Sequence, residues 1–470
     1  MRGLLVVSVL FFALAARATA GGPAMLVGAA EDSPESSSYA TSKLQMDLLK
    51  LAGLNTVRMT ATWSAGETSP PAAQATALTN AVNAAQFSGV RVILSIYPFG
   101  SSVTPLTDQA RSDFAAFAVS IARQFPLVHD FIIGNEPNLN RFWLPQFAPD
   151  GSDAAASSYE QLLATTYDAL KTVRPHSTIY GGALAPHGVD KPNTGRDTHS
   201  ATAFINDLGA AYRASGRALP IMNAFAFHPY PENSTIGPNF PHPNSTAIGL
   251  ADYDKLVGLL ASAFAGTAQR GATLPILYDE FGIESQIPAA KASLYTGTEP
   301  ATTKPVDEAT QAAYYRQAMQ MSFCQKTVLG LLLFHVVDEK ALSAWQSGLY
   351  YADGTPKSSL GGTRDAAGEV HRGVIATCPG LALTPKVTIA PATTTTAGLP
   401  VTLTCSLDCT FTLRLDGRAT LRGSVSGGVA KKLLFRGHIA PGLHHLTATA
   451  TAAANTGPPG TKTVAFSVRS

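Results

Sequence analysis

The feature that most constrains this chain is an alternation, repeated eight times over the first 375 or so residues, of short apolar runs with longer amphipathic stretches. The short runs are rich in β-branched and aromatic residues, which is typical of buried strands. They lie at residues 25–29, 56–60, 91–97, 130–134, 178–183, 224–228, 276–280 and 329–337. Helices are expected between them, for example at residues 45–52, 72–87, 108–125, 157–173, 253–264 and 308–324. This alternation predicts a parallel sheet with crossover helices.

Eight strand–helix units favour one closed sheet over an open, doubly wound one. No G-x-G-x-x-G motif follows any of the strands, which argues against a dinucleotide-binding fold. We therefore predict an α/β fold of the (β/α)8 or TIM-barrel type. A chain of 470 residues also has room for a smaller second domain.

The composition changes after Pro379, where threonine and alanine increase and helical periodicity ends. Short alternating runs follow at residues 387–390, 401–404, 410–415, 444–449 and 464–468. Such runs predict a small all-β sandwich of the immunoglobulin-like kind. We place the boundary near Gly380, which gives a barrel domain at 21–380 and a sandwich at 381–470.

Residues 1–20 have the pattern of a secretory signal peptide: Arg2, an apolar run and an Ala18-Thr19-Ala20 ending. We expect a secreted protein. Its four cysteines then favour two disulfides, because export exposes thiols to oxidation. Cys405 and Cys409 are close enough to pair locally, which leaves Cys324 to pair with Cys378.

The charge balance excludes some partners. The chain has 34 Lys plus Arg and 32 Asp plus Glu, and without residues 1–20 the numbers are 32 and 32. A mature chain without net charge lacks the basic surface that binds nucleic acid or acidic membranes. No later segment is long and apolar enough to predict a membrane span. We expect a monomer.

Two glutamates stand where a barrel enzyme carries its chemistry, at the carboxyl ends of the strands. Glu136 follows the apolar run 131–134, and Glu280 ends the run 276–280. A carboxylate directly after buried apolar residues is costly unless it is paired or used. Two facing carboxylates supply the acid and the base or nucleophile of glycosidic cleavage. Their separation decides between retention and inversion of configuration.

These motifs resemble the clan A glycoside hydrolases over residues 22–378. In that superfamily an Asn-Glu pair, often followed by Pro, ends strand four, and the sequence Gly134-Asn135-Glu136-Pro137 is similar. The resemblance implies that Glu136 is the general acid/base and that Asn135 binds a sugar hydroxyl. It also implies that Glu280 is the nucleophile on strand seven.

Other positions extend the resemblance to a family 5/39-like member. His228 and Tyr230 match the His-x-Tyr pair after strand six, in which the tyrosine contacts the nucleophile. Arg58 matches the arginine beneath the nucleophile, although a structural ion pair is an equally good interpretation of this residue alone. Strand three lacks the usual histidine and strand eight the usual tryptophan, so Tyr97 and Trp345 are expected to take their places.

Further expectations concern three single residues and one segment. Trp143 is either a sugar contact or ordinary packing. Asp279 should point away from the barrel interior by strand alternation, in a structural role. Glu284 is expected to be solvated. The segment 229–248 is long for a loop of this kind and suggests a cleft wall or lid.

No cofactor and no metal are expected. His187, His199 and His242 occur in polar loops without a ligand-pair motif. The hypothesis is a secreted, retaining hydrolase that cleaves O-glycosidic bonds, with β linkages favoured, in an oligo- or polysaccharide. The alternatives are a sugar-binding protein without activity and a transglycosylase on the same machinery.

Overall fold

Eight parallel strands close into a barrel in their sequence order, and β8 pairs with β1. This computed structural model describes residues 21–375, 378–392 and 398–468. The barrel strands are β1 (Leu26–Ala30), β2 (Thr56–Trp63), β3 (Arg91–Pro98), β4 (Asp130–Ile133), β5 (Thr178–Leu184), β6 (Ala224–Phe227), β7 (Ile276–Phe281) and β8 (Val328–Phe334). The predicted (β/α)8 barrel is confirmed.

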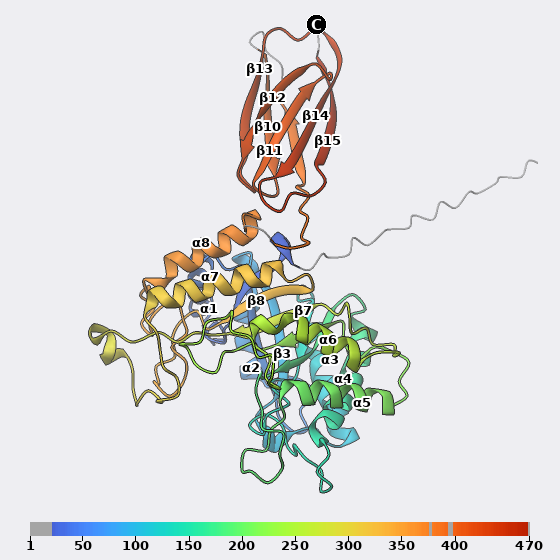
Figure 1. Cartoon of the computed structure of the whole chain (residues 1–470), viewed down its shortest axis with the longest axis vertical. Coiled ribbons are helices and arrows are strands. Elements are labelled where there is room, and N and C mark those ends of the chain that lie inside the picture. The colour runs from blue at the N-terminus through green and yellow to red at the C-terminus, as the bar shows by residue number, and fades with distance from the viewer. Residues whose placement is uncertain (1–20, 376–377, 393–397, 469–470) are drawn as a thin grey trace, which may run out of the picture.

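One helix follows each strand and lies on the outside of the barrel (Figure 1). These helices are α1 (Tyr39–Leu51), α2 (Ala72–Phe87), α3 (Asp108–Gln124), α4 (Ala154–Val173), α5 (Ala201–Ala214), α6 (Tyr253–Ala263), α7 (Glu308–Cys324) and α8 (Ser359–Arg372). Five of them begin at a side chain that caps the first turn, namely Ser38, Thr107, Asp153, Ser200 and Asp307. Short 3-10 helices are η1 (Gly22–Ala24), η2 (Ser101–Val103), η3 (Leu250–Asp252) and η4 (Ala289–Leu294).

The interior of the barrel is packed, which leaves its mouth as the place for a site. A cluster of fully buried side chains contributed by the strands fills it: Ile93, Ile132, Tyr180, Ala183, Ala224, Ala226, Leu277 and Leu332. A larger apolar cluster lies between the strands and the helices. Burial of this apolar surface is the main source of the barrel's stability.

The C-terminal part consists of antiparallel strands, in orange to red in Figure 1. One sheet has the order β13-β10-β9 and the other β12-β11-β14-β15. The strands are β9 (Val387–Pro391), β10 (Gly398–Cys405), β11 (Cys409–Leu415), β12 (Ala419–Val425), β13 (Lys431–Arg436), β14 (Gly442–Ala452) and β15 (Gly460–Val468). The all-β prediction is confirmed. The immunoglobulin-like type and the boundary near Gly380 stay predictions.

Both predicted disulfides are present. Cys324, at the end of α7, bonds to Cys378 with a Cα–Cα distance of 5.1 Å. Cys405 and Cys409 join the end of β10 to the start of β11, at 6.6 Å. The predicted signal peptide, residues 1–20, lies outside the described residues. Within the described ranges, no helix has the length and apolarity that a membrane crossing requires.

Candidate active site

A cavity of about 560 Å³ opens at the carboxyl ends of the barrel strands. Seven of the nine predicted catalytic and substrate-binding residues line it, namely Arg58, Tyr97, Asn135, Glu136, Tyr230, Glu280 and Trp345. His228 lies beneath the cavity and is fully buried. Trp143 is the one predicted residue that the structure does not bring to this place.

The backbone turns sharply at the end of β4 to present Glu136. Gly134 has φ +91°, and a Cβ atom there would meet the Tyr159 ring at 2.7 Å, so only glycine fits. Glu136 itself has φ +42°, an uncommon conformation for a residue with a side chain. Its N–H donates to the carbonyl of Ala183 at 2.8 Å, which fixes the turn to β5. The carboxylate is thereby aimed into the mouth of the barrel.

Glu280 is held by two donors. Arg58 Nη1 forms an ion pair and hydrogen bond with Oε1, and the Tyr230 hydroxyl donates to Oε2 at 2.9 Å. Arg58 also donates to Ser95 Oγ at 3.1 Å and to Asn135 Oδ1 at 2.8 Å. The arginine therefore connects the nucleophile candidate on β7 to the residue that precedes Glu136 after β4.

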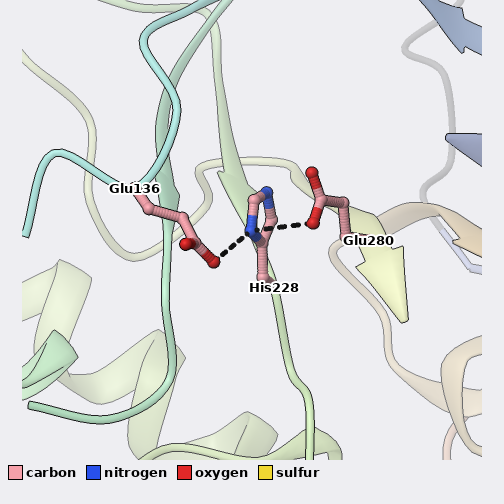
Figure 2. A group of neighbouring side chains, drawn as sticks. All are labelled: Glu136, His228 and Glu280. Atoms are coloured by element: carbon pink, nitrogen blue, oxygen red, sulfur yellow. Dashed lines mark hydrogen bonds and ion pairs between the residues drawn. The ribbon is translucent and has the colours of Figure 1, made fainter. Parts of the chain in front are cut away.

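His228 lies between the two glutamates, and all three side chains point toward one another (Figure 2). Its Nδ1 is 3.0 Å from Glu136 Oε1 and 3.4 Å from Glu280 Oε2. Nδ1 and one oxygen of each carboxylate lie within 4.8 Å of one another. Burial alone would lower the pKa of His228, but Glu280 and Asp279 outweigh it and raise the pKa to about 10. The imidazole is therefore a cation at neutral pH.

The expected orientation of Asp279 is wrong. Its carboxylate is fully buried, 3.2 Å from His228 Nε2 and 3.5 Å from Arg58 Nε, so it faces the charged network. The cause is an irregularity in the pairing of β7 with β8 between Tyr278 and Phe281, which breaks the simple alternation of faces. Burial raises the pKa of Asp279, yet His228 and Arg58 outweigh burial and lower it. Asp279 thus orients the two cations that contact Glu280.

Tyr97 and Trp345 line the cavity beside this network. The Tyr97 hydroxyl donates to Thr60 Oγ1 at 3.4 Å, and burial raises its pKa to about 12. The Trp345 ring lies 5.0 Å from Tyr230 and 5.2 Å, edge-on, from Phe334. These aromatic side chains make the apolar wall on which a pyranose ring can stack.

Trp143 and Glu284 differ from the expectations. Trp143 is 1% exposed, packs edge-on against Tyr159 and donates its indole N–H to Ser158 Oγ. It therefore belongs to the core. The neighbouring Phe142 lines the cavity instead. Glu284 is buried rather than solvated. It accepts a hydrogen bond from the Gln346 N–H at 3.2 Å, and burial raises its pKa to about 7.

Sequence reasoning missed an acidic wall of the cavity, formed by Glu31, Asp32 and Glu339 around His335. Glu31 accepts hydrogen bonds from two main-chain N–H groups beyond β8, at 2.7 and 3.2 Å, which ties the end of β1 to β8. Burial would lower the pKa of His335, but Glu31 and Glu339 raise it to about 10. The signal was present, because Glu31 and Asp32 directly follow an apolar strand.

The segment 229–248 contributes to the site. Tyr230 is its second residue, and a smaller cavity of about 160 Å³ is lined by residues 230–234 together with Trp345. The segment therefore forms a wall beside the mouth. Its action as a lid stays a prediction.

Comparisons support the fold only. No family profile and no curated protein matches the chain. Solved structures are similar to it. A glucosidase from Croceicoccus marinus aligns with a TM-score of 0.53 and 11% identity over 89% of this chain and 95% of its own. A GH5_18 protein from Streptomyces cattleya, in complex with Manβ1-4GlcNAc, aligns with a TM-score of 0.51 and 15% identity over 77% of this chain and 84% of its own. The Bacteroides uniformis β-glucuronidase 2 aligns with a TM-score of 0.46 and 15% identity over 94% of this chain, and this chain spans only 45% of its length.

Proposed function

We propose that this protein is a retaining glycoside hydrolase with Glu136 as general acid/base and Glu280 as nucleophile. The observation that carries the proposal is the arrangement of the two carboxylates at one cavity, with one oxygen of each within 4.8 Å of the other. Retaining enzymes place their carboxyl groups about 5 to 5.5 Å apart, and inverting enzymes about 6.5 to 9.5 Å. The short distance between the nearest oxygens of Glu136 and Glu280 supports the retaining arrangement.

The first step is protonation of the glycosidic oxygen by Glu136 while Glu280 attacks the anomeric carbon. The C–O bond to the leaving group breaks, and a glycosyl ester forms on Glu280. Arg58 and Tyr230 orient the attacking carboxylate, because both donate to its oxygens. In the second step Glu136 takes a proton from water, which attacks the anomeric carbon and releases Glu280.

The substrate in this proposal is a β-linked oligo- or polysaccharide. The aromatic wall of Tyr230 and Trp345 fits the apolar face of a pyranose ring, and the acidic wall offers acceptors for its hydroxyl groups. Similar folds occur in a glucosidase and in a protein bound to Manβ1-4GlcNAc. We also propose that the protein is secreted and monomeric, the former on the pattern of residues 1–20 and the two disulfides.

Azide rescue of two variants tests the assignment, after a panel of aryl β-glycosides has identified a substrate. Glu280→Ala should lose turnover, and azide should restore it with a glycosyl azide of inverted configuration. Glu136→Ala should give an azide product of retained configuration, because azide then intercepts the ester on Glu280. Glu369→Ala, on α8 and paired with Arg316, is the control that should behave as the wild type.

Two outcomes would contradict this proposal. Wild-type turnover in Glu280→Ala would remove the nucleophile assignment. Sugar binding without turnover of any substrate would favour the non-catalytic binding protein. Product analysis at high acceptor concentration separates hydrolysis from transglycosylation, since the two differ only in the acceptor of the glycosyl group.

A further inference from the structure

Behind the loop that carries Glu136, three side chains converge from separate parts of the sequence. Asp153 caps α4, His199 ends the connection from β5 to α5, and Asp207 lies on α5. One potential ligand atom of each lies within 4.8 Å of the others. His199 Nε2 is 3.4 Å from Asp153 Oδ1. The cluster is separate from the catalytic network.

A buried, unsatisfied oxygen accompanies the cluster. The Asp153 side chain is 3% exposed, and its Oδ1 caps α4 by accepting from the Ala156 N–H at 2.8 Å. Asp153 Oδ2 is buried and has no hydrogen-bond partner among the described residues. Burying a carboxylate oxygen without a partner is costly, and a bound cation offsets such a cost.

We propose that Asp153, His199 and Asp207 bind a divalent transition-metal ion of the Zn²⁺ class. An imidazole nitrogen with carboxylate oxygens suits Zn²⁺, whereas Ca²⁺ and Mg²⁺ prefer sites made of oxygen alone. The ligand atoms need to close in, because Zn–N and Zn–O bonds are about 2.0 to 2.2 Å long. Asp207 is on a helix surface and has the rotamer freedom to do so.

His199 can release its present contact without leaving an unpaired acceptor. Its Nε2 lies 3.0 Å from the carbonyl oxygen of Gln146. That oxygen also accepts from the N–H groups of Ala154 and Ala155, at 3.0 and 3.3 Å. The carbonyl therefore stays satisfied when His199 turns its nitrogen lone pair to a metal.

The metal would stabilise the loop of the acid/base. The His199 N–H donates to the Asn138 carbonyl at 2.9 Å, and the Asn138 amide donates to the His199 carbonyl at 2.9 Å. Asn138 is two residues beyond Glu136. The proposal revises the expectation that His199 binds no metal. The sequence contains no ligand motif because Asp153 and His199 are far apart along the chain.

Zinc stoichiometry tests the site, by equilibrium dialysis with Zn²⁺ followed by metal analysis, and by thermal melting with and without Zn²⁺. Asp207→Asn should bind one equivalent fewer than the wild type and lose the Zn²⁺-dependent rise in Tm. Asp153→Asn, which keeps a capping residue, should behave likewise. The matched control is Asp254→Asn, an exposed position on α6, which should keep that equivalent.

Glu280→Gln controls for zinc at the catalytic network, because Glu136, His228 and Glu280 form a second cluster of possible ligands. Glu280→Gln should still bind the equivalent of Zn²⁺ that Asp207→Asn loses. The proposal is overturned if the wild type binds no Zn²⁺. It is equally overturned if Asp207→Asn and Asp153→Asn bind as much as the wild type, or if only Glu280→Gln loses binding.

Discussion

Replacing Arg58 by methionine separates the structural from the catalytic use of the charged network. Arg58 has a side chain only 5% exposed and pairs with Asp279 and Glu280, whose side chains are 0% and 10% exposed. Methionine fills much of the same volume but carries no charge and no donor. The variant therefore leaves two carboxylates buried, with His228 as their remaining cation.

The expected cost in stability is about 3 to 5 kcal/mol, the usual consequence of removing one partner of a buried ion pair. Catalysis should suffer as well, because Arg58 holds Glu280 in position through a charged hydrogen bond that methionine cannot make. If about 2 kcal/mol of the cost falls on Glu280, kcat/KM decreases by roughly 30-fold. Urea unfolding at pH 7 and initial rates on an aryl glycoside measure the two effects.

Arg91→Met is the matched control. Arg91 pairs with Asp130, which is buried at the start of β4, the end of the barrel opposite the mouth. Arg91→Met should lose less stability than Arg58→Met, because the Arg91 side chain is half exposed. Its kcat/KM should stay at the wild-type value. The reasoning is refuted if Arg58→Met costs less than about 1 kcal/mol, or if both variants lose activity equally.

Three further changes have defined outcomes. Tyr230→Phe removes the hydroxyl that orients Glu280 and should lower kcat by about tenfold with little change in KM, measured by steady-state kinetics. The folded state raises the pKa of His335, so the charged imidazole contributes stability that is fully present below its ordinary pKa of 6.5 and is lost as the pH rises through about 10. The difference in unfolding free energy between the wild type and His335→Asn, measured by urea titration, should therefore shrink from pH 6.5 to about pH 10. Replacing Cys324 and Cys378 by serine opens a loop of 54 residues and should lower the unfolding free energy by about 4 kcal/mol, measured by urea unfolding. An unchanged urea midpoint would contradict this prediction.

The barrel could be predicted because its strands are buried on both faces and therefore occur as continuous apolar runs. Strand β2 and helices α2 and α7 begin at the expected residues. In the C-terminal part, β12 and β13 were missed. β12 consists mostly of small and polar residues, and in β13 three charged residues flank a continuous run of three apolar ones, so neither sequence has the alternation that identified the other strands.

The meeting of Glu136 and Glu280 at one cavity could be predicted for a similar reason, since each stands at the carboxyl end of an apolar strand. The same rule applied to β1 would have found Glu31. Asp279 could not be predicted, because its orientation depends on a pairing irregularity that leaves no mark in the sequence. The burial of Trp143 was equally hidden, since it depends on how α4 packs beneath the loop.

Trapping of the glycosyl-enzyme tests the central claim most directly. A 2-deoxy-2-fluoro β-glycoside with a good leaving group forms the ester on the nucleophile and slows its hydrolysis, so that intact mass should increase by one glycosyl unit. Peptide mapping should place that unit on Glu280. A label on another residue, or turnover with inversion of configuration and no label, would contradict the proposed pairing of Glu136 with Glu280.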